Sequence, residues 1–212
     1  MGLPSPPARE KSDALLLRDK VDQVSPVKWL ARTTRNVVLE RTPWLGLFLT
    51  GLLLCASVMH HFEKLLAKRV ELAFFVPMLI GHGGNSGVQA VSSVIRSIAV
   101  DGSAHPAKTL TVESAAGLLQ SLVLSAFIAP ALRLSMNISI PVCTVVALSL
   151  PALGFFANTC GAALPYMAVR IGLDPAVVCG PMMTTLVDTV GVLIYLSIAL
   201  AILGDLDDDP GH

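Results

Sequence analysis

Long stretches without charged residues alternate with short charged segments along most of this 212-residue chain. A helix needs about 20 mainly apolar residues to cross the hydrocarbon core of a bilayer. The pattern therefore predicts an all-α membrane protein with about five transmembrane helices within residues 43–204. The stretches are 43–59, 72–95, 114–132, 140–169 and 175–203, and the last of them holds one charge, Asp188.

The segments on either side of this region are polar. Residues 1–24 are rich in proline and charge, which predicts a disordered leader rather than a cleaved signal peptide. Residues 25–42 combine apolar positions near helical spacing with basic side chains, which predicts an amphipathic helix on the membrane surface. A helix packed against the rest of the protein is the alternative. Residues 205–212 form an acidic tail that either attracts cations or is simply solvated.

The composition supports a membrane protein and excludes two other classes. Hydrophobic residues make up 53% of the chain and charged residues 14%, which is too apolar for an ordinary soluble enzyme. The 15 basic and 15 acidic residues cancel, so the basic surplus of a nucleic-acid binder is missing. The four cysteines are scattered and are expected to be inert apolar residues.

The basic residues also predict an orientation, because cytoplasmic loops are enriched in Lys and Arg. With the N-terminus inside, the inner side holds the eight basic residues before position 43 together with Arg96, Lys108 and Arg170. The remaining four fall outside. We therefore expect a multi-pass protein of the cell (plasma) membrane, with a cytoplasmic N-terminus and the C-terminus outside.

The second stretch contains the run GHGGNSG at positions 81–87, followed by Gln89. Glycine weakens a helix, so the run predicts a broken second helix whose irregular backbone lines a watery path. Asn85 and Gln89 are four residues apart and would share a face if the second half is helical. The alternative is close helix packing through Gly83 and Gly87. His82 is expected to pack rather than to bind a metal, and the lone Asn158 of the fourth stretch is expected to form a hydrogen bond between helices.

Asp188 is an acid within an apolar stretch, where a carboxylate costs at least about 2.5 kcal/mol. Such a residue indicates a functional site, although a protonated Asp that holds helices together is the alternative. Thr184 and Thr185 lie one turn earlier and can line the same passage. Asp174 and Pro175 are typical of a helix N-cap and first position, and Asp174 can also serve as a cation site at the mouth.

These ligands are carboxylate, amide, hydroxyl and backbone carbonyl groups. Zinc and copper fit poorly, whereas hard oxygen ligands suit magnesium, calcium or manganese. A single Asp is too little for an all-protein cage, which favours Mg²⁺ with most of its waters retained. A two-fold dimer would bring two copies of Asp188 to one axis, where a divalent cation offsets their repulsion.

Two motifs carry a family resemblance. FFVPMLIGHGGNSGVQAVSSVIRSIAV and GLDPAVVCGPMMTTLVDTVGVLIY resemble the membrane domain of MgtE-type magnesium channels, as do PWL in the first stretch and Phe62-Glu63 after it. One repeat of the two-repeat animal magnesium carriers is similar. The resemblance implies a homodimer of five-helix subunits with the ion path near the two-fold axis. It also implies a large cytoplasmic sensor in bacterial members, for which the roughly 40 residues before the first stretch are too short.

The resemblance implies that Asp188 lines a central magnesium site surrounded by Gly81, Asn85 and Thr184, with Asp174 near the cytoplasmic mouth. Together, the two lines of reasoning give five expected metal-site residues and four pathway residues. The metal-site residues are Asp188, Asn85, Gly81, Thr184 and Asp174, and the pathway residues are Thr185, Gln89, Gly84 and Glu63.

The expected function is therefore a divalent-cation channel or transporter in the lipid bilayer. Mg²⁺ is the expected ion, with Mn²⁺, Ca²⁺ and Co²⁺ as further candidates. A sodium- or proton-coupled exchanger of the same fold and a non-conducting membrane subunit of a sensor complex are the alternatives. An enzyme is not expected, because the chain has neither a GxSxG nor an HExxH motif.

Overall fold

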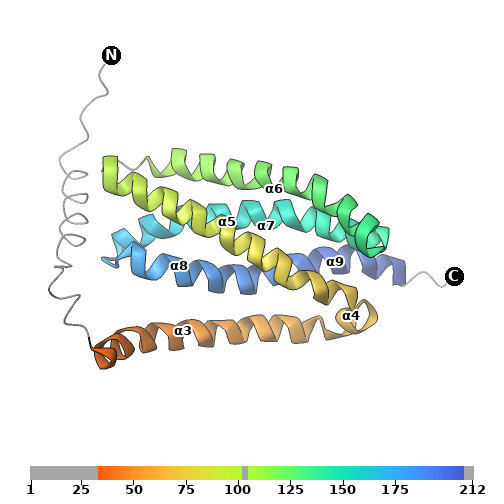
Figure 1. Cartoon of the computed structure of the whole chain (residues 1–212), viewed down its shortest axis with the longest axis horizontal. Coiled ribbons are helices and arrows are strands. Elements are labelled where there is room, and N and C mark those ends of the chain that lie inside the picture. The colour runs from red at the N-terminus through yellow and green to blue at the C-terminus, as the bar shows by residue number, and fades with distance from the viewer. Residues whose placement is uncertain (1–32, 102–104, 208–212) are drawn as a thin grey trace, which may run out of the picture.

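The computed structural model describes residues 33–101 and 105–207, and these form helices without strands. The elements, which Figure 1 labels, lie roughly along one direction. They are α3 (Thr34–His61), α4 (Glu63–Lys68), α5 (Glu71–Asp101), α6 (Pro106–Met136), α7 (Ile140–Arg170), α8 (Pro175–Leu186), the π-helical turn η1 (Val187–Gly191) and α9 (Val192–Asp207). The predicted all-α fold is confirmed.

Four spans in the described part of the chain are long and apolar enough to cross a membrane. They are α3, α6, α7 and the continuous run from α8 through η1 to Gly204. The fifth long helix, α5, has 31 residues and lies alongside them, but the polar residues at its middle make it less apolar.

Helix α7 forms the centre of the bundle and α3 lies at its edge. The buried residues of α7 include Val142, Leu150, Ala157 and Gly161, and this helix packs against α5, α6 and α9. In contrast, α3 has no buried residue and contacts only the last span and α4 among the described elements with more than marginal contact. The bundle therefore has a buried centre at α7 and an exposed edge at α3.

The predicted break in the second helix is wrong. α5 continues as a regular α-helix through the whole run from Gly81 to Gly87. Four glycines lower helix propensity by about 1 kcal/mol each relative to alanine, but close packing offsets this cost. A Cβ at Gly83 would lie 2.9 Å from Cγ1 of Val187, and one at Gly87 would lie 3.0 Å from the carbonyl oxygen of Ala157. The packing alternative describes this helix correctly.

The irregular segment is in the last span instead. Residues Val187–Gly191 form a single π-helical turn that contains Asp188, between the regular helices α8 and α9. The predicted helix start is confirmed, because Asp174 is the N-cap of α8 and its Oδ1 accepts a hydrogen bond of 2.9 Å from the backbone nitrogen of Ala176.

Parts of the predicted segments lie outside the described residues. This applies to the leader 1–24, to residues 25–32 of the amphipathic segment 25–42 and to residues 208–212 of the acidic tail. Within the described part, α3 begins at Thr34 and continues through position 42 without interruption to His61. The division between a surface helix and a first span at residue 43 stays a prediction.

Candidate ion site

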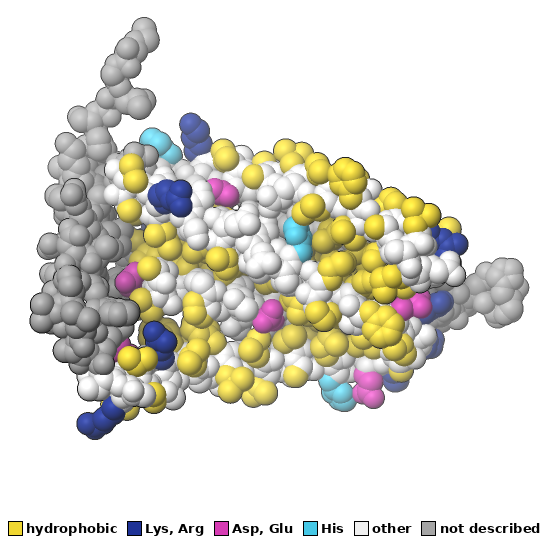
Figure 2. Space-filling view, viewed as in Figure 1, with side chains coloured by type: hydrophobic (Ala, Val, Ile, Leu, Met, Phe, Trp, Pro, Cys, Tyr) yellow, Lys and Arg dark blue, Asp and Glu magenta, His cyan; other side chains and the backbone are white. Residues whose placement is uncertain are grey.

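A hollow of about 670 Å³ lies on the side of the bundle, between α5 and the last span. Asp188 supplies the one carboxylate among its described lining residues. Figure 2 shows acidic atoms in the middle of one face of the molecule, between ends where most Lys and Arg atoms gather. The lining comprises Pro77, Ile80, Gly81, Gly84, Asn85, Val88, Gln89, Thr184 and Asp188.

The π-helical turn determines how Asp188 is presented to this hollow. A π-turn inserts one extra residue into a helix and disturbs the regular hydrogen-bond ladder, and such turns are frequent at functional sites. The main-chain oxygen of Asp188 accepts a hydrogen bond from the Sγ of Cys55 on α3, over 3.0 Å. The side chain of Asp188 is partly exposed. The first span thus supports the backbone of the turn while the carboxylate stays accessible.

The neutral oxygen ligands come from both sides of the hollow, from α5 and from α8. Asn85 is exposed on α5, and Gly81 beside it has no heavy atom within 4 Å of the position that a Cβ would take, apart from its own helix backbone and chain neighbours. On α8, the hydroxyl of exposed Thr184 donates to the carbonyl oxygen of Gly180 over 3.2 Å. Its lone pairs remain available to accept a hydrogen bond or bind a cation.

This ligand set suits a hydrated hard cation. One carboxylate, two amides and one hydroxyl are too few to replace the full water shell of a divalent ion, and Mg²⁺ gives up its waters reluctantly. No group of three His, Cys, Asp or Glu side chains that could hold a metal comes together within residues 33–101 and 105–207. The hollow can therefore hold an ion mainly through its water molecules.

Six of the nine predicted site residues line the hollow: Asp188, Asn85, Gly81, Thr184, Gln89 and Gly84. The lining does not include the other three. Thr185 faces α3, because a Cβ at Gly51 would lie 2.7 Å from its Cγ2. Asp174 lies 14 positions before Asp188, about 21 Å along the helix axis. Glu63 is exposed on α4, with its Oε2 3.1 Å from Nδ1 of His60.

Known proteins resemble this chain over the same region. The family model MgtE, described as a divalent cation transporter, matches residues 76–198, which contain every described lining residue of the hollow. This chain belongs to the MgtE family.

Three magnesium transporters named MgtE are among its relatives. The protein of Thermus thermophilus is 37% identical over 168 residues, which are 78% of this chain and 37% of that protein. The protein of Bacillus subtilis is 32% identical over 79% of this chain, and that of Enterococcus faecalis is 29% identical over 76%. This chain spans little more than a third of the length of these relatives.

In this member of the MgtE family, sequence reasoning missed a polar network behind the hollow. The side-chain nitrogens of Gln120 on α6 and Asn158 on α7 both donate to Oγ of buried Ser86, each over 2.5 Å. One turn away, Nε2 of His82 and Oγ of Ser121 are 2.8 Å apart. The helix–helix role expected of Asn158 is confirmed. Because Ser86 follows Asn85 directly, the network fixes the rotation of α5 that turns Asn85 toward the hollow.

Proposed function

We propose that this chain transports magnesium across a membrane and that a largely hydrated Mg²⁺ ion passes through the hollow beside Asp188. The observation that carries the proposal is the meeting of one carboxylate with amide and hydroxyl oxygens at the middle of an apolar bundle. The names of the three relatives, all magnesium transporters, support the choice of ion.

The polar side of α5 supports a two-fold dimer. Gly81, Asn85 and Gln89 are exposed in the single chain, although they lie in the middle of a helix packed among spans. Polar groups facing lipid there would be costly, because hydrocarbon offers no hydrogen-bond partners. A second copy placed against this side covers the hollow, encloses a watery path and supplies a second Asp188.

In this arrangement, the residues have separate roles. Asp188 attracts the cation and its carboxylate oxygens accept hydrogen bonds from the inner water shell. Asn85 and Thr184 orient further waters, and the absence of side chains at Gly81 and Gly84 leaves room for the hydrated ion. Gln89 continues the path along α5. Asp174 is assigned to the cytoplasmic mouth, whereas Thr185 and Glu63 lie outside the hollow and act on the pathway only indirectly.

The test is Mg²⁺ uptake into liposomes that contain the purified full chain, as wild type, Asp188→Asn and Asp188→Ala. A single negative charge about 4.5 Å from a divalent ion contributes about 2 kcal/mol even in water, so uptake at sub-saturating Mg²⁺ should fall at least about tenfold. Glu113→Gln on α6 is the matched control, because it also replaces a carboxylate by an amide but lies outside the described lining. Variants as active as wild type would refute the proposed role of Asp188.

The same liposomes distinguish a channel from a coupled exchanger. Uptake driven only by the Mg²⁺ gradient and the membrane potential should persist when sodium and proton gradients are removed. Uptake that stops without one of these gradients would instead identify the exchanger. Competition by Mn²⁺, Ca²⁺ and Co²⁺ measures the ion preference, with strongest competition expected from ions whose hydrated size is closest to that of Mg²⁺.

A further inference from the structure

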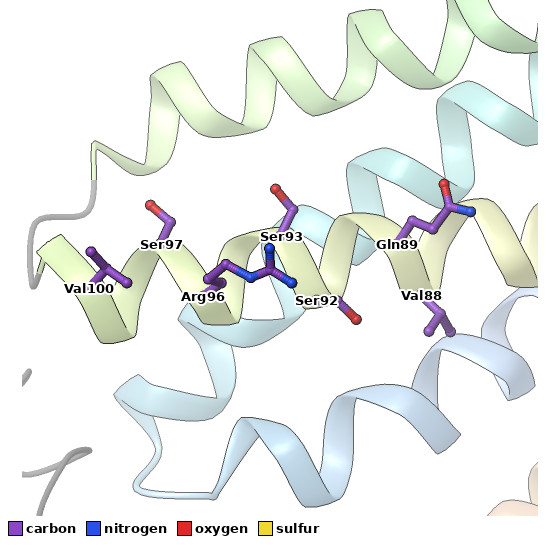
Figure 3. A pocket seen from close by; sticks show the side chains of 7 residues that line it. All are labelled: Val88, Gln89, Ser92, Ser93, Arg96, Ser97 and Val100. Atoms are coloured by element: carbon purple, nitrogen blue, oxygen red, sulfur yellow. The ribbon is translucent and has the colours of Figure 1, made fainter.

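A groove of about 620 Å³ runs along α5 from the hollow toward the end of the helix at Asp101. It shares Val88 and Gln89 with the hollow, so the two surfaces are continuous. All its described lining residues belong to α5 and follow one another at helical spacing, as Figure 3 shows. They are Val88, Gln89, Ser92, Ser93, Arg96, Ser97 and Val100.

The groove holds one charged side chain, Arg96, among three serines. Arg96 is exposed in the single chain. A long basic side chain near the end of a membrane helix usually extends toward the nearer end, where its charge reaches water. Figure 3 shows the opposite: the guanidinium is turned back along the helix, in the direction of Ser93 and Gln89. The positive charge therefore lies closer to the hollow than the Cα of Arg96 does.

From these observations we infer that Arg96 forms an electrostatic barrier on the ion path, which slows the passage of divalent cations between the Asp188 hollow and this end of the bundle. Arg96 lies 11 positions after Asn85, about 16 Å along the helix axis. A guanidinium is always charged and repels a divalent ion twice as strongly as a monovalent one. The inference rests on the proposed function, and in a dimer two such charges face the same path.

The experiment compares Mg²⁺ uptake by wild type, Arg96→Gln and Arg96→Lys in liposomes at low ionic strength. Arg96→Gln should raise initial uptake about threefold, and Arg96→Lys should stay near wild type because it keeps the charge. Lys108→Gln is the matched control. It removes the same charge from the start of α6, at the same end of the bundle but outside the groove, and should leave uptake within about 1.5-fold of wild type.

Ionic strength gives a readout that a purely structural role would not move. The distance over which salt screens charge falls from roughly 30 Å at 0.01 M to about 3 Å at 1 M. The ratio of Arg96→Gln to wild-type uptake should therefore fall toward one when an inert salt is added to 1 M on both sides. If Arg96→Gln does not fold, Ser93→Asp offers a second route, because it places a negative charge one turn from Arg96 and should also raise uptake.

The outcomes distinguish a failure of the proposed Mg²⁺ transport from a failure of the proposed barrier at Arg96. Wild-type liposomes that take up no Mg²⁺ would refute the proposed function. Normal wild-type uptake, combined with Arg96→Gln uptake that is unchanged, lower or insensitive to salt, would refute the barrier alone. An increase in the Lys108→Gln control equal to that of Arg96→Gln would also refute it, because the effect would then come from surface charge in general.

Discussion

The hollow has two walls, α5 on one side and the span α8–η1–α9 on the other, and different contacts hold them in place. α5 is a regular helix that packs on the central helix α7 through glycines and through the hydrogen bond from Asn158 to Ser86, while Gln120 of α6 donates a second hydrogen bond to Ser86. The opposite wall begins at Asp174, which caps α8, and contains the π-turn at Asp188. It contacts the exposed helix α3 through the hydrogen bond from Cys55 to Asp188.

The difference in contacts follows from the ligands that each wall presents to the hollow. The neutral ligands of α5 need only a fixed rotation of a straight helix, which tight packing supplies. The carboxylate of Asp188 sits on a turn with a disturbed hydrogen-bond ladder, so its position depends on a few local contacts. We therefore expect substitutions that create steric overlap to destabilise the α5 wall. The α8–η1–α9 wall should instead be sensitive to the loss of single hydrogen bonds.

The largest expected effect is on the α5 wall. A Cβ at Gly161 of α7 would overlap the carbonyl oxygen of Gly87 on α5, which as backbone cannot rotate away. Gly161→Ala should therefore push the two helices apart and lower the free energy of unfolding by about 3 kcal/mol, at the upper end of ordinary overpacking. Thermal unfolding of the purified protein in detergent measures the change.

Gly84→Ala is the matched control for this prediction. Gly84 lines the hollow, and a Cβ there would meet no heavy atom within 4 Å apart from its own helix backbone and chain neighbours. Because alanine favours a helix by about 1 kcal/mol over glycine, this variant should be at least as stable as wild type. Equal stability of Gly161→Ala and Gly84→Ala would show that close packing does not hold the first wall.

The next effect is on the π-turn. Cys55→Ala removes the thiol that donates to the main-chain oxygen of Asp188 and should cost about 1.5 kcal/mol, because that oxygen loses its donor from α3. The looser turn should also raise the Mg²⁺ concentration needed for half-maximal uptake. Unfolding in detergent and uptake in liposomes measure the two quantities.

Cys55→Ser separates this hydrogen bond from the size of the side chain. Serine keeps a donor at the same position and should restore most of the stability and the Mg²⁺ dependence. The interpretation of the second wall is wrong if the Ala and Ser variants behave alike, since the contact would then act through volume only.

The positions of the helices could be predicted because the signal for a span is the length of an uncharged stretch, which does not depend on neighbouring residues. The start of α8 at Asp174 and Pro175 was predictable for a similar local reason. The continuity of α5 was not, because the cost of its glycines is local whereas the gain comes from Val187 and Ala157 on other helices. No residue pattern in Val187–Gly191 distinguishes a π-turn from ordinary helix.

The residues of the candidate site likewise include some that local spacing predicts and others that depend on helix packing. Asn85 and Gln89 share a face through their spacing, and both line the hollow as expected. Thr184 and Thr185 are neighbours that point about 100° apart, and the sequence alone does not say which of them faces α3. Ser86 and Gln120 were missed because their hydrogen bond depends on how α5 and α6 are rotated, which only the packed structure determines.

The smallest expected effect is at the start of the second wall, at Asp174. Asp174→Ala removes the side chain that accepts the backbone hydrogen of Ala176 and should lower the free energy of unfolding by about 1 kcal/mol. Asp174→Asn keeps the cap and should keep the stability. If the carboxylate also attracts cations at the mouth, Asp174→Asn should lower Mg²⁺ uptake at low ionic strength despite its normal stability. Uptake equal to wild type would leave Asp174 with its capping role alone, and the carboxylate of Asp188 would then act without it.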